Sequence, residues 1–139
     1  MTRNRQIVIS TVDYARLEPM IRDAVASAST AREWLCALKS KIDEARVLEP
    51  RDMPGDVVTM NCLVRVRDLG TKEVESYTLV YPAFADINKN HLSILTPVGI
   101  ALLGLRQGET VEWPALLGPR RLRVEEVEFQ PESAGQYDV

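Results

Sequence analysis

The chain contains few of the side chains that most enzyme and metal chemistry requires. Its 139 residues include one histidine, His91, and two cysteines, Cys36 and Cys62, far apart in the sequence. A zinc site or a CxxC redox pair needs closer spacing, and a lone histidine forms neither a triad nor a metal cluster. We therefore expect no catalytic residue, metal or cofactor. We interpret both cysteines as packing residues, since a free cysteine behaves as a small buried hydrophobe.

Long apolar runs and an excess of positive charge are also absent. A stretch such as Val98 to Leu105 is far shorter than the roughly 18 residues of a membrane-spanning helix. Charged Asp13 and Arg16 follow the first short apolar run, so no signal peptide develops. With 17 Lys and Arg against 20 Asp and Glu, the chain does not suit binding to nucleic acid through phosphate neutralisation. We expect a cytoplasmic protein without a membrane segment or direct sequence-specific nucleic acid binding.

The segment from Glu49 to Asp56 divides the chain. Its two prolines and one glycine prevent a helix from continuing through it. Charge changes at the same place: residues 1–48 hold eight basic and six acidic side chains (+2), and residues 49–139 hold nine and fourteen (−5). We predict two domains, residues 1–49 and residues 50–139.

The first region has the spacing of paired helices. Gln6 to Ile9 could form a short strand, and Ser10 or Thr11 can cap a helix whose first turn contains Asp13. Apolar residues then recur at intervals of three and four in two runs, which are Tyr14, Leu17, Ile21, Ala24 and Ala28, and Leu35, Leu38, Ile42 and Ala45. Small residues at 27–30 suit a turn, so the spacing predicts a short antiparallel helical hairpin, or coiled coil. Pro19 predicts a kink or a late start in the first helix.

The second region changes to a period of two. Alternation over residues 58–66 predicts a strand with one buried face, and further strands are predicted at about 72–81, 91–95, 109–113 and 120–129. A change of parity at Glu125 and Glu126 predicts a bulge in the last strand. Thr96 can cap a short helix of about two turns that Pro97 begins and that Gly104 and Gly108 close. The expected fold is α+β, with an antiparallel sheet and one short helix after the hairpin.

Four runs of residues resemble the GreA/GreB family of transcription elongation factors. They are GDVVTMN (55–61), LVYP (79–82), SILTPVGIALLGLRQGETVEW (93–113) and VEFQPESAGQYD (127–138). Together they are similar to smaller regulators of that family over almost the whole chain. The segment 94–113 also resembles the C-terminal domain of GreA and GreB, with Thr-Pro, Ala-Leu-Leu-Gly and Gly-Glu-Thr-Val in order. The resemblance implies an FKBP-like C-terminal domain and an N-terminal coiled coil.

The resemblance also implies a partner, RNA polymerase. The globular domain would grip the rim of the polymerase secondary channel, with the hairpin pointing inward, in competition with GreA and GreB. In the family, the turn before the short helix is a polymerase contact, and Leu95, Thr96 and Pro97 occupy that turn here. The alternative is that Thr96 and Pro97 only begin a helix.

The hairpin tip departs from the GreA/GreB pattern. Gre factors carry paired acidic residues there, which help to hold a catalytic Mg²⁺ through hard oxygen ligands. Residues 24–33 read AVASASTARE, with no carboxylate between Asp23 and Glu33, and these two lie on opposite legs. The hairpin is also shorter than a Gre coiled coil. We expect a monomeric transcription regulator that does not stimulate transcript cleavage and is not an enzyme. Residues 114–121, PALLGPRR, depart from the family as well, which leaves the role of that loop open.

Two other functions stay open. An FKBP-like fold can support peptidyl-prolyl isomerase activity in an aromatic-lined pocket, although fold alone does not carry function. No cluster of aromatic residues marks such a pocket, and we interpret Trp113 and Phe129 as core residues. An interaction domain for another protein could use Trp34 as an anchor, or the acidic run Glu125 to Glu128 against a basic surface. The alternatives are that Trp34 packs against the globular domain or the facing helix, and that the acidic run is only a solvated strand face.

Overall fold

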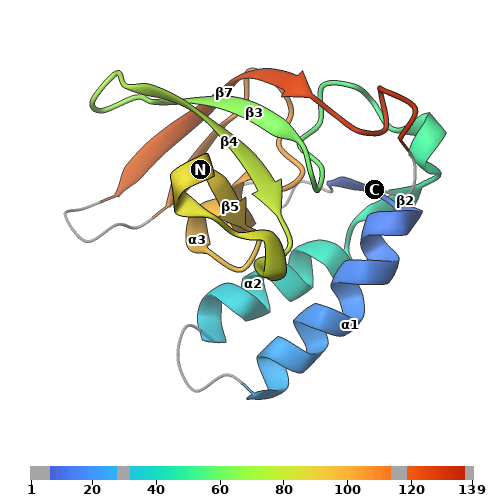
Figure 1. Cartoon of the computed structure of the whole chain (residues 1–139). Coiled ribbons are helices and arrows are strands. Elements are labelled where there is room, and N and C mark those ends of the chain that lie inside the picture. The colour runs from blue at the N-terminus through green and yellow to red at the C-terminus, as the bar shows by residue number, and fades with distance from the viewer. Residues whose placement is uncertain (1–6, 28–31, 114–118, 137–139) are drawn as a thin grey trace.

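The computed structural model describes residues 7–27, 32–113 and 119–136, which form a helical hairpin packed beside a five-stranded sheet (Figure 1). The hairpin consists of α1 (Thr11–Ser27) and α2 (Arg32–Asp43), flanked by β1 (Val8–Ser10) and β2 (Arg46–Leu48). The sheet contains β3 (Leu63–Asp68), β4 (Val74–Val80), β5 (His91–Ser93), β6 (Thr110–Trp113) and β7 (Arg120–Phe129). The short helix α3 (Pro97–Leu102) contacts both α2 and β6, and 3₁₀ helices lie at Pro50–Asp52, Pro82–Phe84 and Ile87–Lys89.

The predicted hairpin seam is confirmed within the described residues. Leu17 and Ile21 of α1 and Leu38 and Ile42 of α2 are fully buried, as apolar residues at heptad spacing on two facing helices should be. The Ser10 Oγ accepts a hydrogen bond from the Asp13 amide at 3.0 Å, so Ser10 caps α1. The helix begins at Thr11 and continues through Pro19, so the alternative of a late start is wrong. Residues 28–31, which include Ala28 and the predicted turn, lie outside the described residues.

The α+β fold is confirmed, with one difference in strand direction. The strand order is β5-β4-β3-β7-β6, and three of the pairings are antiparallel. The β4–β5 pairing is parallel, so the expectation of a wholly antiparallel sheet is wrong. The segment from Tyr81 to Asn90, with its two 3₁₀ helices, turns the chain back so that β5 begins beside Thr78 and runs in the same direction as the last residues of β4. The predicted bulge is confirmed, because Arg65 pairs with Glu126 and Val66 with Val124, leaving Glu125 unpaired.

The strand predicted over residues 58–66 begins only at Leu63. Val57, Val58, Thr59 and Met60 are all buried in succession, so their side chains do not alternate between core and solvent. Val58 instead exchanges backbone hydrogen bonds with the segment after α3, donating to Leu105 at 2.8 Å and accepting from Gly104 at 3.0 Å. Asn61 then adopts a left-handed conformation, with a φ of 62°, and this redirects the chain into β3.

One hydrophobic cluster includes residues from both sides of the predicted boundary at residue 50. Leu17, Ile21, Leu38 and Ile42 belong to the same cluster as sheet residues such as Val64. The division into residues 1–49 and 50–139 stays a prediction. No helix among the described residues combines the length and the apolar character that crossing a bilayer requires.

Three residues expected in the interior differ in their surroundings. Cys62 is buried, but Cys36 is exposed because it lies one position beyond buried Leu35, off the hairpin seam. Phe129 is 38% exposed, since it lies at the end of β7 beyond a second register shift. Core roles for Cys36 and Phe129 are therefore wrong, and the side chain of Trp113 lies outside the described part of the chain.

Candidate functional site

The turn between β5 and α3, which consists of Leu95, Thr96 and Pro97, is held by hydrogen bonds to Ser93. The Ser93 Oγ accepts from the Leu95 amide at 3.1 Å. The Ser93 carbonyl accepts from the Thr96 amide at 3.1 Å and from the Thr96 hydroxyl at 2.7 Å. The Thr96 Oγ also accepts from the Gly99 amide at 3.1 Å, and Pro97 is the first helical residue, so the predicted cap of α3 is confirmed. We name Leu95, Thr96 and Pro97 the contact turn.

Gly99 is a residue of this site that sequence reasoning missed. A Cβ atom at Gly99 would lie 2.3 Å from the Ser93 carbonyl oxygen and 3.2 Å from the Ile94 Cα. The turn can therefore fold this tightly over the first helical residues only with glycine at this position. The available signal was a glycine inside a short helix, which costs about 1 kcal/mol relative to alanine and so calls for a packing reason.

The contact turn is partly accessible. Leu95, Thr96 and Pro97 are each half-buried, and Leu95 and Val98 pack against the hydrophobic cluster. The three predicted site residues are consecutive, and the structure places them in one hydrogen-bonded, partly exposed turn. Their role in binding a partner stays a prediction.

The carboxylates nearest the hairpin tip lie on separate helices. Asp23 is exposed near the end of α1, and Glu33 is exposed at the start of α2. The rest of the tip, residues 28–31, is outside the described residues. Within the described residues, no group of three or more His, Cys, Asp or Glu side chains could hold a metal ion.

A buried carboxylate joins α1 to the globular part. Asp13, only 2% exposed, accepts a hydrogen bond from the Met60 amide at 3.2 Å and one from the Tyr81 hydroxyl at 3.4 Å. Glu132, also buried, accepts a hydrogen bond from the Thr59 hydroxyl at 2.9 Å. Burial, and then the negative charge of Glu132, raise the pKa of Asp13 to about 7. The acid is therefore held where its neutral form is favoured.

A lysine joins α2 to α3. The Lys41 ammonium donates to the carbonyl oxygens of Ile100 at 2.8 Å and Ala101 at 3.4 Å, at the C-terminal end of α3. Burial lowers the pKa of Lys41 to about 8, since the charged form loses water. Nothing in the local sequence pattern pointed to Asp13 or Lys41 as junction residues, because their partners are distant in the chain.

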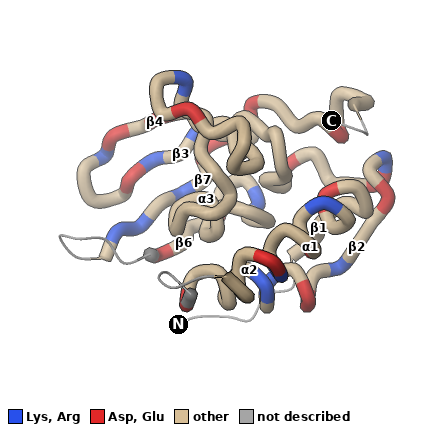
Figure 2. The backbone as a smooth tube through the Cα atoms, turned by 60° about the horizontal axis from the view of Figure 1, so that its bottom comes forward, with Lys and Arg blue, Asp and Glu red and all other residues tan. Residues whose placement is uncertain are grey.

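The acidic run of β7 is paired within the sheet. Glu126 forms an ion pair with Arg65 at 2.9 Å, and Glu125 forms pairs with Arg67 and Arg123. Both β3 and β7 accordingly carry basic as well as acidic residues, whereas Glu75 is the one charged residue of β4 (Figure 2). This pairing opposes the use of the run as an acidic docking surface. The other alternative anchor, Trp34, is half-buried and packs against the hydrophobic cluster.

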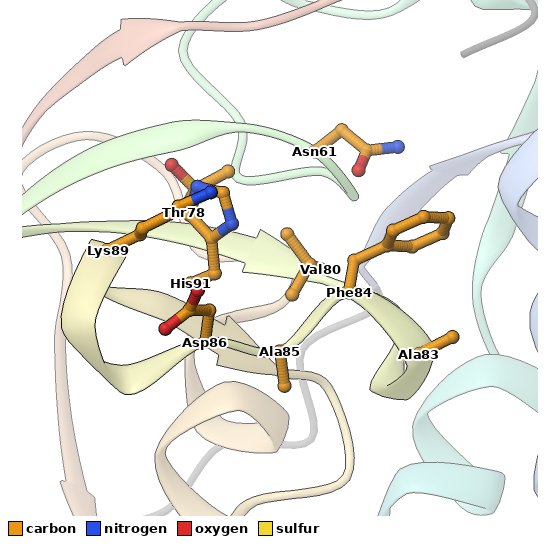
Figure 3. Close-up of a pocket in the computed structure, with 9 residues that line it drawn as sticks. All are labelled: Asn61, Thr78, Val80, Ala83, Phe84, Ala85, Asp86, Lys89 and His91. Carbon is orange, nitrogen blue, oxygen red and sulfur yellow. The ribbon is translucent and has the colours of Figure 1, made fainter.

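An open groove of about 480 Å³ lies beside β4 and the two 3₁₀ helices that follow it (Figure 3). Phe84, which is 66% exposed, is the one aromatic side chain among the residues that line it. The groove also contains the single histidine, His91, next to Asp86 and Lys89. It is neither enclosed nor rich in aromatic rings, so it offers little support for the isomerase alternative.

Comparisons with known proteins point to one family. Residues 53–129 match the domain described as "Transcription elongation factor, GreA/GreB, C-term". The chain is 39% identical over 132 residues to "Regulator of nucleoside diphosphate kinase" of Escherichia coli K12, covering 94% of this chain and 95% of that protein. It is 30% identical over 130 residues to GreA of Syntrophobacter fumaroxidans, covering 88% and 83% of the two chains.

A solved structure shares the fold. It is described as "Prokaryotic transcription elongation factor GreA/GreB from Nitrosomonas europaea", with a TM-score of 0.74 and 40% sequence identity. The match covers 89% of this chain and all of that one, so it includes the hairpin as well as the sheet.

Proposed function

The chain belongs to the GreA/GreB family of transcription elongation factors, and from this we propose that it binds RNA polymerase at the rim of the secondary channel. In this proposal it regulates transcription by occupying the channel in competition with GreA and GreB. Residues 50–139 act as the docking domain, and residues 1–49 form the hairpin that enters the channel. The transcription-factor-like role follows from the family. Binding at the secondary channel, competition with GreA and GreB, and the separate roles of the two regions are the proposal.

The contact turn is the observation that carries the proposal. Four hydrogen bonds around Ser93 and Thr96 hold Leu95 and Pro97 at the surface before any partner arrives. A preorganised turn loses little conformational entropy on binding, which favours affinity. The turn also lies inside the stretch that matches the GreA/GreB domain, residues 53–129.

The hairpin supports occupancy of the channel without stimulation of transcript cleavage. A helix rises 1.5 Å per residue, so the 17 residues of α1 extend about 25 Å and the 12 residues of α2 about 18 Å. Asp23 and Glu33 lie on different helices, whereas cleavage needs clustered hard oxygen ligands for a catalytic Mg²⁺. We therefore propose that the hairpin obstructs the channel and delivers no metal ligands to the polymerase active site.

Any effect on nucleoside diphosphate kinase would be indirect, through transcription. The relative from Escherichia coli carries the name of a regulator of that enzyme. Phosphoryl transfer by such a kinase requires a phosphorylated histidine in a nucleotide pocket, and the one histidine here, His91, lies in an open groove. The sequence also has no phosphate-binding glycine-rich loop.

Capture of purified RNA polymerase on the immobilised protein tests the docking step, with GreB added as competitor. Pro97→Ala should weaken binding about tenfold, the effect of one moderately important interface residue. Pro82→Ala is the matched control, since Pro82 also begins a short helix but lies outside the contact turn. Failure of the unmodified protein to bind, or binding that GreB does not displace, would contradict the proposal.

A transcript-cleavage assay on backtracked polymerase tests the role of the hairpin. At stoichiometric protein we expect no stimulation by this chain alone, and a loss of the stimulation that added GreB produces. Stimulation by the protein itself would refute the proposed absence of cleavage activity.

A further inference from the structure

Both ends of α3 are involved in contacts that bear on the orientation of the hairpin relative to the contact turn. Its N-terminal end is the contact turn, and its C-terminal end receives the ammonium group of Lys41 from the last turn of α2. At 1.5 Å per residue, the six residues of α3 extend about 9 Å. A short, capped helix of this kind is a rigid spacer between the two contacts.

The carbonyl groups that Lys41 contacts are those that the end of the helix leaves available. Continuation of α3 would bring the amides of Gly104 and Leu105 to the carbonyls of Ile100 and Ala101. These amides donate instead to Val58 at 3.0 Å and to Leu102 at 3.1 Å. Lys41 satisfies the two carbonyls from another element, and a cation is favourable at this end of a helix.

The hairpin has a different polar attachment on its other leg. Asp13, at the start of α1, accepts a hydrogen bond from the Met60 amide. Apolar packing holds the hairpin against the sheet, and hydrogen bonds of narrow geometry add a directional constraint to that packing. Removal of the Lys41 contact would leave α1 attached and free α2 to shift relative to α3.

We propose that Lys41 is a positioning residue that fixes the angle of the hairpin relative to the contact turn. We call the hydrogen bonds from Lys41 to the carbonyls of Ile100 and Ala101 the clamp. The clamp itself follows from the contacts between α2 and α3, and its consequence at RNA polymerase rests on the proposed function. When the contact turn binds the channel rim, the clamp directs the hairpin along the channel. Without it, docking at the rim continues but the hairpin enters the channel less often.

A distance measurement tests the clamp without polymerase. Cys36, exposed on α2, and a cysteine introduced by Arg121→Cys on β7 accept spin labels, whereas Cys62 is buried. Double electron-electron resonance then gives the distribution of distances between α2 and the sheet. Lys41→Met should broaden or shift this distribution beyond its width in the unmodified protein. Lys41→Arg should restore it, since a guanidinium group can donate to both carbonyls.

Lys39→Met is the matched control. Lys39 lies on the same helix and pairs with Asp43 at 2.7 Å on the exposed face, so this change removes the same charge and leaves α3 untouched. An unchanged distance distribution in Lys41→Met would overturn the proposal. If that variant does not fold, Lys41→Gln replaces it, because its shorter amide cannot span both carbonyls. An unchanged distribution in Lys41→Gln would overturn the proposal equally.

Competition with GreB for polymerase tests the consequence. Lys41→Met should raise the concentration needed for half-displacement about tenfold, the change expected when the channel-directed angle is populated in about a tenth of the molecules, and Lys39→Met should not. Equal competition by the two variants would overturn the positioning role. If even the unmodified protein fails to compete, the proposed function is wrong, while the distance measurement still decides the role of Lys41.

Discussion

The buried carboxylate at the junction predicts how stability depends on pH. Asp13 has a pKa of about 7 in the folded protein, against an ordinary value of 3.8, mainly because burial disfavours its charged form. Below pH 3.8 both states hold the proton, and the contribution of the neutral acid to stability is fully present. As the pH rises to about 7, the unfolded chain releases its proton and the folded protein does not, so that contribution is lost.

The size of the effect follows from the two pKa values. Each pH unit between them lowers the free energy of unfolding by about 1.4 kcal/mol. Between pH 5 and pH 8 the unfolded chain is already ionised and the folded protein loses its proton near pH 7. The loss over this interval is therefore about 3 kcal/mol.

Asp13→Asn should remove this pH dependence. The asparagine oxygen can still accept a hydrogen bond from the Met60 amide, and its NH₂ group can donate to the Tyr81 hydroxyl oxygen, while the side chain does not titrate. Urea unfolding followed by the fluorescence of Trp34 and Trp113 gives the free energy of unfolding of both proteins. The variant should gain about 3 kcal/mol of stability relative to the unmodified protein between pH 5 and pH 8.

Two controls isolate the cause. Asp23→Asn makes the same chemical change at an exposed position of the same helix. Glu132→Gln keeps an acceptor for the Thr59 hydroxyl but removes the charge that helps to raise the pKa of Asp13, so it should reduce the pH effect. A stability difference between Asp13→Asn and the unmodified protein that changes by less than about 1 kcal/mol from pH 5 to pH 8 would refute the reasoning.

Three further predictions concern folding and the contact turn. Gly99→Ala should lower the melting temperature and weaken polymerase capture together, because its Cβ would meet the Ser93 carbonyl at 2.3 Å, and unchanged values of both would contradict the packing at the turn. Leu38→Ala should cost about 2–5 kcal/mol in urea unfolding, as for a large core residue replaced by alanine, and a cost below about 1 kcal/mol would exclude a shared core. Asn61→Val should destabilise the protein by about 1–2 kcal/mol, because a β-branched residue disfavours positive φ, while Asn61→Gly should not, and equal effects in calorimetry would argue against the left-handed turn.

Local chemistry made several elements predictable from the sequence. Heptad spacing identified the buried residues Leu17, Ile21, Leu38 and Ile42, because an α-helix places positions three and four apart on one face. The Thr96 and Pro97 pair marked the start of α3, because both residues act on backbone groups within their own turn. A change of parity in β7 marked its bulge at Glu125, since side chains alternate in a strand.

Burial that depends on residues distant in the chain is less predictable from the sequence. The apolar residues Val58, Met60 and Cys62 alternate in the sequence as in a strand, yet tertiary contacts bury the intervening Thr59 and turn the chain at Asn61. The parallel direction of β5 depends on the path of the 81–90 segment around the sheet edge.

The sequence by itself determined a helical hairpin, an α+β globular part, the position of the contact turn and the family to which the chain belongs. These features depend on residues that are neighbours along the chain, or on motifs that resemble known proteins. Only the tertiary structure decided how the two parts are joined, through Asp13 with the Met60 amide and Lys41 with the carbonyls of Ile100 and Ala101. The partners in these contacts lie 47, 59 and 60 positions apart, so no local pattern of charge or hydrophobicity specifies that they meet.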